Sequence, residues 1–190
     1  MQGGATLKED SVLDLGIIIT CVLPGCIVLW GIGQLFPPLA DAWISVNSLR
    51  SATVGSFFYI ILASIGAGMT IGCARWLVID TLHHWTGLRP PRWDFAKLAE
   101  RTEAFHLLIE IHYKYYLFYA NSLTAALFAY VAWRSRHSLS AEPIGWADAG
   151  SLAICLMFAA GSRDTLRRYY RRAGELLRQE ETPPRIIALK

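Results

Sequence analysis

The amino-acid sequence predicts an all-α integral membrane protein with four transmembrane helices, the third and fourth of which extend into the cytoplasm. Three observations predict this fold class. Of the 190 residues 54% are hydrophobic, and the mean hydropathy is +0.34, more apolar than an ordinary soluble domain. Four long apolar segments are separated by three connections. Fifteen of the eighteen lysines and arginines fall on one side of that arrangement.

The first two segments are long and almost free of charge. Residues 15–36 carry no charge, and about 20 apolar residues suffice to cross a bilayer. Pro24, followed by a glycine, predicts a kink in the middle of this segment. Residues 55–79 form the second segment, in which Ser64, Gly68 and Gly72 recur every four residues. Small residues at this spacing let two helices approach closely. We favour packing within the chain, with a subunit interface as the alternative.

The third segment belongs to one long predicted helix. No glycine or proline occurs between Asp94 and Pro143, and apolar residues recur there at helical spacing. This predicts a helix from about Asp94 to Arg134, roughly 60 Å long at 1.5 Å per residue, against a hydrocarbon core of about 30 Å. Residues 115–134 are therefore predicted to span the bilayer, and residues 94–114 to project into the cytoplasm.

The fourth segment is residues 144–162. Asp148 lies near its start at the outer face, where an acidic residue suits the beginning of a helix. Its helix is predicted to continue over residues 163–182, with an apolar stripe that packs on the other extension. Four arginines crowd this continuation: Arg167, Arg168, Arg171 and Arg172. Clusters of cations just inside a membrane are typical of segments that bind anionic lipid headgroups.

The placement of cations predicts the orientation of the chain. The N-terminus, the middle connection and the C-terminus share one face, and the opposite face carries only Arg50, Arg134 and Arg136. Cytoplasmic loops are the ones enriched in lysine and arginine. We therefore expect residues 1–190 to form a single multi-pass domain of the plasma (inner) membrane, with both termini in the cytoplasm.

One group of residues near the inner interface suggests chemistry. The second segment ends with Asp80, His83 and His84, and the third helix carries His106, Glu110 and His112. Helix-borne carboxylates and imidazoles hold transition metals in some helix bundles. They also form ion-paired collars, here with Arg75 and Arg163. The sequence has only five histidines, fewer than a membrane di-iron enzyme is expected to carry, so we favour the collar, without a cofactor.

Other motifs are missing. The four cysteines lie in apolar segments without C-x-x-C spacing, which is typical of packing residues. The sequence has no phosphate-binding loop, nucleophile elbow or H-E-x-x-H motif. It therefore predicts a non-enzymatic, oligomeric membrane module that conducts ions or a signal, or anchors a cytoplasmic protein partner; nucleic acid is not an expected partner. The alternative is a membrane metalloenzyme that holds a transition metal at the His/carboxylate set.

Overall fold

The structure is a computed structural model, and it describes residues 16, 18–38, 54–91, 95–138 and 144–177. The prediction of an all-α chain is confirmed for these residues, among which no strand occurs. The elements in chain order are the π-helical turn η1 (Ile18–Val22), α2 (Leu23–Leu35), α5 (Val54–Arg75), the π-helical turn η2 (Trp76–Asp80), α6 (Thr81–Trp85), α7 (Phe95–Glu100), α8 (Thr102–Leu108), the π-helical turn η3 (Ile109–Tyr113), α9 (Lys114–Ser138) and α10 (Trp146–Leu177).

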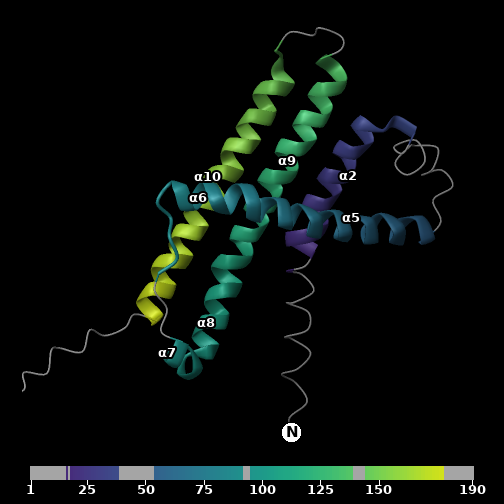
Figure 1. Cartoon of the computed structure of the whole chain (residues 1–190). Coiled ribbons are helices and arrows are strands. Elements are labelled where there is room, and N and C mark those ends of the chain that lie inside the picture. Colours follow the sequence, from purple (N-terminus) through teal and green to yellow (C-terminus); the bar gives the residue numbers. More distant parts are fainter. Residues whose placement is uncertain (1–15, 17, 39–53, 92–94, 139–143, 178–190) are drawn as a thin grey trace, which may run out of the picture.

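Two long helices form the frame of the molecule. Helices α9 and α10 run antiparallel, and α2 leans on the half of α9 that is nearer to their connection (Figure 1). The α5–α6 helix, formed by α5, η2 and α6 in succession, runs across this frame rather than along it (Figure 1). Its stretch Phe57–Trp85, 29 residues, is the one helix in the described part that is both long and apolar enough to cross a membrane. Residues Thr20–Leu35 form a shorter apolar helix.

Helices α2 and α5 cross at a point where only glycines fit. A Cβ atom on Gly25 would lie 1.8 Å from the carbonyl oxygen of Ser64, and one on Gly68 would lie 2.1 Å from the carbonyl oxygen of Cys21. The Ser64 side chain is fully buried and donates its proton to the carbonyl of Ile60 at 2.7 Å. The two backbones are therefore in direct contact, as the small-residue spacing of α5 predicts for a contact within the chain.

Gly72 does not take part in this contact. No atom lies within 4 Å of the position that its Cβ would occupy, and the residue is half-exposed. The four-residue spacing from Ser64 and Gly68 predicts a place for Gly72 in the same contact. Eight residues turn an α-helix by about 80° beyond two full turns, so Gly72 faces away, and Ile71 instead packs with Val28 of α2.

The start of α2 explains how α2 is joined to α9. Pro24 has no N–H group for the carbonyl of Thr20 one turn earlier, and the helix opens there into the π-helical turn η1. The Nδ2 amide of Asn121 on α9 donates to that carbonyl at 2.8 Å. Asn121 is 5% exposed, so its amide replaces a helical hydrogen bond that neither water nor Pro24 supplies.

Before α9, the chain runs through α7, α8 and η3 along α10. The buried side of α10 in this region is an apolar stripe of Leu166, Tyr169, Ala173 and Leu177. Burial raises the pKa of Tyr169 to about 12, so the phenol stays protonated in the core. The ring centres of Tyr113 and Tyr169 lie 5.1 Å apart, and this contact joins η3 to α10.

The long predicted helix is broken at Arg101, which corrects the expectation of an uninterrupted helix from Asp94; Asp94 itself lies outside the described residues. The backbone of Arg101 leaves the helical region (φ −122°, ψ 27°), and its guanidinium donates to the carbonyl of Leu176 at 2.8 Å. The hydroxyl of Thr102 donates to the carbonyls of Leu98 and Ala99. Side chains thus satisfy carbonyls at the break, which turns α7 toward α10.

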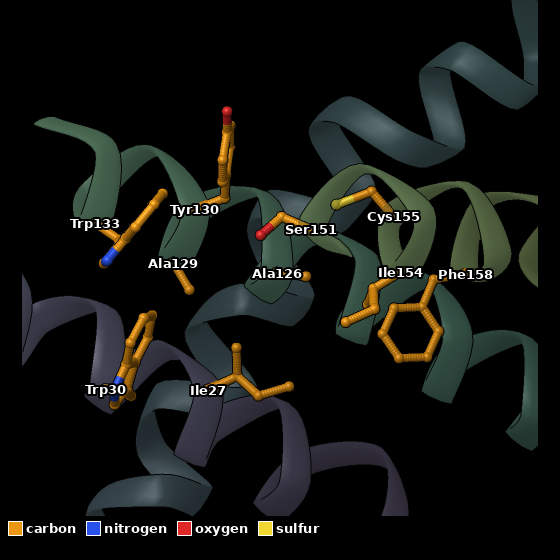
Figure 2. A pocket seen from close by; sticks show the side chains of 10 residues that line it. All are labelled: Ile27, Trp30, Ala126, Ala129, Tyr130, Trp133, Ser151, Ile154, Cys155 and Phe158. Atoms are coloured by element: carbon orange, nitrogen blue, oxygen red, sulfur yellow. The ribbon is translucent and has the colours of Figure 1, made fainter. Parts of the chain in front are cut away.

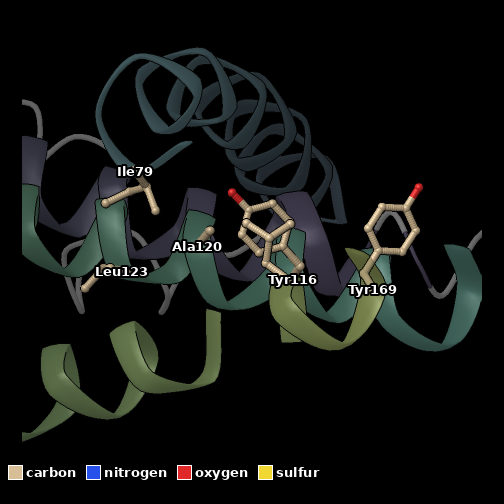
Figure 3. Packing of buried hydrophobic residues seen from close by; sticks show 6 residues of the cluster. Ile79, Tyr116, Ala120, Leu123 and Tyr169 are labelled. Atoms are coloured by element: carbon tan, nitrogen blue, oxygen red, sulfur yellow. The ribbon is translucent and has the colours of Figure 1, made fainter. Parts of the chain in front are cut away.

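The main core lies where the α5–α6 helix meets the frame. Figure 3 shows Ile79 of η2 reaching down onto Ala120 and Leu123 of α9, with Tyr116 and Tyr169 beside them. Leu166 of α10 completes the cluster. Helices that are far apart in sequence therefore share one buried core. This core positions the polar residues of η2, α6 and α9.

The crossing of α2 and α5 predicts different effects for three glycines on one helix. Gly68→Ala should lower the melting temperature of the detergent-solubilised protein, because an overpacked contact costs about 1–3 kcal/mol. Gly66→Ala and Gly72→Ala are matched controls with open space at the Cβ position. These two substitutions should leave the melting temperature unchanged or raise it slightly, because alanine stabilises a helix relative to glycine. An equal loss in all three variants would contradict the crossing.

The contact between Asn121 and Thr20 predicts coupling between two substitutions. Asn121→Ala should destabilise the protein by about 1 kcal/mol, the net value of a typical hydrogen bond. Pro24→Ala supplies an N–H group to the same carbonyl, so Asn121→Ala should cost clearly less in the Pro24→Ala background. A double-mutant cycle on unfolding free energies measures the coupling. Strictly additive effects would show that the freed carbonyl does not need Asn121.

Candidate functional site

The most polar buried site lies at the junction of η2 and α9. The Arg75 guanidinium pairs with the carboxylate of Asp80, with Nη1 at 3.2 Å from Oδ1, and the two side chains are 10% and 19% exposed. Tyr116 donates its hydroxyl to the same carboxylate oxygen. The guanidinium carbon also lies 5.5 Å from the centre of the Tyr116 ring, within the range of a cation–π contact. We call these three residues the inner triad.

The π-helical turn η2 brings two members of the inner triad together. Arg75 and Asp80 are five residues apart, a spacing that places side chains on different faces of an α-helix. The hydrogen bonds of a π-helix join residues five apart, and η2 spans Trp76–Asp80. The wider turn therefore moves the carboxylate of Asp80 round to the side of Arg75.

A second polar contact joins α6 to α10. The hydroxyl of Ser162 donates to the carbonyl of Ala159 at 3.0 Å and lies 3.2 Å from Nε2 of His83. Both side chains are buried. The hydrogen bond between His83 and Ser162 holds α6 on α10.

Arg163 closes the end of α6. Its guanidinium donates to the hydroxyl of Thr86 at 2.8 Å and to the Thr86 carbonyl at 3.3 Å. Gly87 follows with φ +91°, and the amide of Leu88 donates to the carbonyl of His83 at 3.0 Å. This is the usual way to end a helix, and a cation there also complements the helix dipole.

The remaining predicted site residues lie apart from the triad. Glu110 pairs with Lys114 one turn later at 2.9 Å, and this hydrogen bond lowers the pKa of the Glu110 carboxyl. His84 and His106 are exposed. His112 is half-buried, and its Nε2 has no hydrogen-bond partner among the described residues.

The six residues proposed for a metal are therefore not brought together. No three His, Cys, Asp or Glu side chains in the described part of the chain lie close enough to hold a metal ion. The spacing of Asp80, His83 and His84 suggests one helix face, but His83 turns into the protein and His84 turns outward. The carboxylate of Asp80 is instead occupied by Arg75 and Tyr116.

The chemistry of the inner triad is that of a closed ion pair. Its carboxylate is held by a cation and a phenol, so it is not poised as a base. The buried Nε of Arg75 has no partner among the described residues and remains a potential donor. The arrangement holds the α5–α6 helix and α9 in register.

Sequence reasoning missed Tyr116, Ser162 and Asn121. Tyr116 is one of several tyrosines near the interface and is 2% exposed, whereas its neighbour Tyr115 is 52% exposed. Only the helical phase of α9 separates them, and the π-helical turn η3 shifts that phase. Asn121 had a usable signal, because an amide in the middle of an apolar segment needs a partner.

No family model, no curated protein and no solved structure matches this chain.

The inner triad predicts unequal effects for two carboxylates. Asp80→Asn leaves the buried Arg75 cation without its counter-charge and should destabilise the protein by about 3 kcal/mol. Glu110→Gln removes a partly exposed pair within one helix and should change the melting temperature far less. Thermal unfolding in one detergent measures both. A larger loss for Glu110→Gln than for Asp80→Asn would contradict this assignment.

Proposed function

We propose that the chain is a non-catalytic module of the inner membrane that self-associates and anchors a cytoplasmic protein partner through the helices at its inner end. The observation that carries this proposal is the two-faced helix α10 beyond Ser162. One face packs on α8 and η3, and the other presents arginines. A helical platform with one face covered and one charged face free is suited to holding a partner or a lipid surface.

The charged face is made of exposed side chains on successive turns: Arg163, Asp164, Arg167, Arg168, Arg171, Arg172 and Glu175. Asp164 pairs with Arg168 at 2.8 Å, so it neutralises one of the arginines. The remaining excess of positive charge favours anionic lipid headgroups of the inner leaflet, which attract clusters of cations near the membrane surface. We therefore propose that this face rests against the leaflet and sets the height of the platform.

The proposal includes four membrane crossings. Its main support is the distribution of cations, with fifteen of eighteen on the predicted cytoplasmic side. The 29-residue stretch Phe57–Trp85 measures about 44 Å at 1.5 Å per residue, longer than a core of about 30 Å. A helix of this length crosses the core when it is strongly tilted. This fits its crossing of α9 and α10 in Figure 1.

The topology is tested by labelling single cysteines in a variant whose four natural cysteines are replaced by alanine. Glu100→Cys and Glu175→Cys lie at the inner end, and Arg136→Cys lies at the outer end of α9; all three positions are exposed. An impermeant thiol reagent added to intact cells should label only the Arg136 position. Permeabilised cells should label all three. Labelling at Glu175 in intact cells would refute the orientation.

The anchoring role is tested by cross-linking in living cells. A photoreactive amino acid at Glu103, exposed on α8 and outside the charged face, should give a protein adduct, whereas one at Ala153, on the exposed apolar part of α10, should not. Adducts twice the mass of the chain would report self-association. The same purified protein in proteoliposomes should show no ion flux above that of empty vesicles. A flux that is lost in Asp80→Asn would favour conduction instead.

A further inference from the structure

A pocket of about 210 Å³ lies between α2, α9 and α10, away from the inner triad. Aromatic side chains form most of its walls: Trp30, Tyr130, Trp133 and Phe158 (Figure 2). Ile27 and Ile154 complete the apolar lining. Ala126 and Ala129 of α9 also line the pocket, and their small side chains leave space in it.

The size of the pocket fits a small ring. A protein cavity of about 150 Å³ with apolar walls binds benzene and stays free of water. The pocket here is somewhat larger and partly open, so a single substituted ring can enter from the side of α2 and α10, where Trp30 and Ile154 are about half exposed. Aromatic walls also favour a ring over a saturated chain, because rings stack edge to face or offset at close distance.

The pocket contains one hydroxyl that the protein does not use. Thr124, Ser135 and Thr165 each donate to a carbonyl four residues earlier, as hydroxyls in helices commonly do. The hydroxyl of Ser151 forms no such bond with any residue that the structure describes, and it points into the pocket in Figure 2.

The other hydroxyl of the lining is already occupied. Tyr130 donates its hydroxyl to Asp148 at 2.8 Å, and Asp148 also accepts the amide of Gly145 at 2.8 Å. In Figure 2 the ring of Tyr130 points away from the centre of the pocket. Ser151 Oγ is therefore the hydroxyl of the lining that can bind a ligand, beside the indole N–H groups of Trp30 and Trp133 and the thiol of Cys155.

We propose that this pocket is a binding site for a single-ring aromatic molecule with one oxygen substituent, such as a phenol. The ring packs against Trp30, Trp133 and Phe158, and its oxygen forms a hydrogen bond with Ser151. A lipid acyl chain fills the space less well, because it has no aromatic face and leaves the Ser151 hydroxyl without a partner. The inference is independent of the membrane topology, since it concerns a pocket inside the folded chain.

The test uses two probes of nearly equal size, 4-fluorophenol and 4-fluorotoluene, observed by fluorine NMR with the purified full-length protein in detergent. Micelles without protein provide the blank. Both probes should show a saturable bound signal at one site per chain. Signals identical to those of empty micelles would overturn the proposal, because they would report partitioning into detergent alone.

Two pairs of variants then locate the site. Ala126→Leu fills the pocket and should abolish the bound signal, whereas Ala153→Leu, on the exposed side of α10, should not. Ser151→Ala should lower the affinity for 4-fluorophenol relative to 4-fluorotoluene about fivefold, the ratio that corresponds to one net hydrogen bond of about 1 kcal/mol. Ser135→Ala, an exposed serine outside the pocket, should leave that ratio unchanged. An unchanged ratio in Ser151→Ala, or undiminished binding in Ala126→Leu, would overturn the proposal.

Discussion

The contact of the buried Arg75–Asp80 pair with Tyr116 of α9 fixes the place where the α5–α6 helix crosses the frame of α9 and α10. Removing a guanidinium and a carboxylate from water is unfavourable, so each needs the other once both are buried. Tyr116 of α9 binds the pair from the opposite side. Both charges lie on the α5–α6 helix, so sliding this helix along the frame would remove the hydroxyl and ring of Tyr116 from the buried pair.

Two further contacts hold the ends of this arrangement. Beyond Arg75 toward the start of α5, Gly68 and Gly25 bring α5 against α2, and Asn121 ties α2 to α9. Toward the end of α6, His83 and Arg163 fix the helix on α10. Each contact is a polar or backbone interaction that depends on exact position, whereas the apolar side chains around it tolerate exchange. The polar contacts thus select one arrangement of helices from many that bury similar apolar area.

The sequence predicts the helical class and most helix positions, because apolar periodicity and the absence of glycine and proline are local signals. It predicts a glycine contact on α5 but extends it to Gly72, although a four-residue spacing leaves the buried face of a helix with 3.6 residues per turn after two turns. It does not predict the π-helical turns. These turns change the helical phase by a fraction of a turn, which decides that Asp80 meets Arg75 and that Tyr116 rather than Tyr115 is buried. The break at Arg101 depends on a carbonyl of α10 that is distant in sequence.

We propose that the α5–α6 helix crosses the bilayer at a steep tilt while it crosses α9 and α10. Spin labels at exposed positions along this helix, Phe58, Leu62, Met69, Leu77 and Trp85, report depth through their relative accessibility to oxygen and to a water-soluble nickel reagent. The depth of the spin label in the bilayer should be greatest near Met69 and decrease toward both ends of the helix. An equal depth of the label at all five positions would show that the helix lies in the plane of the membrane, and it would refute the crossing.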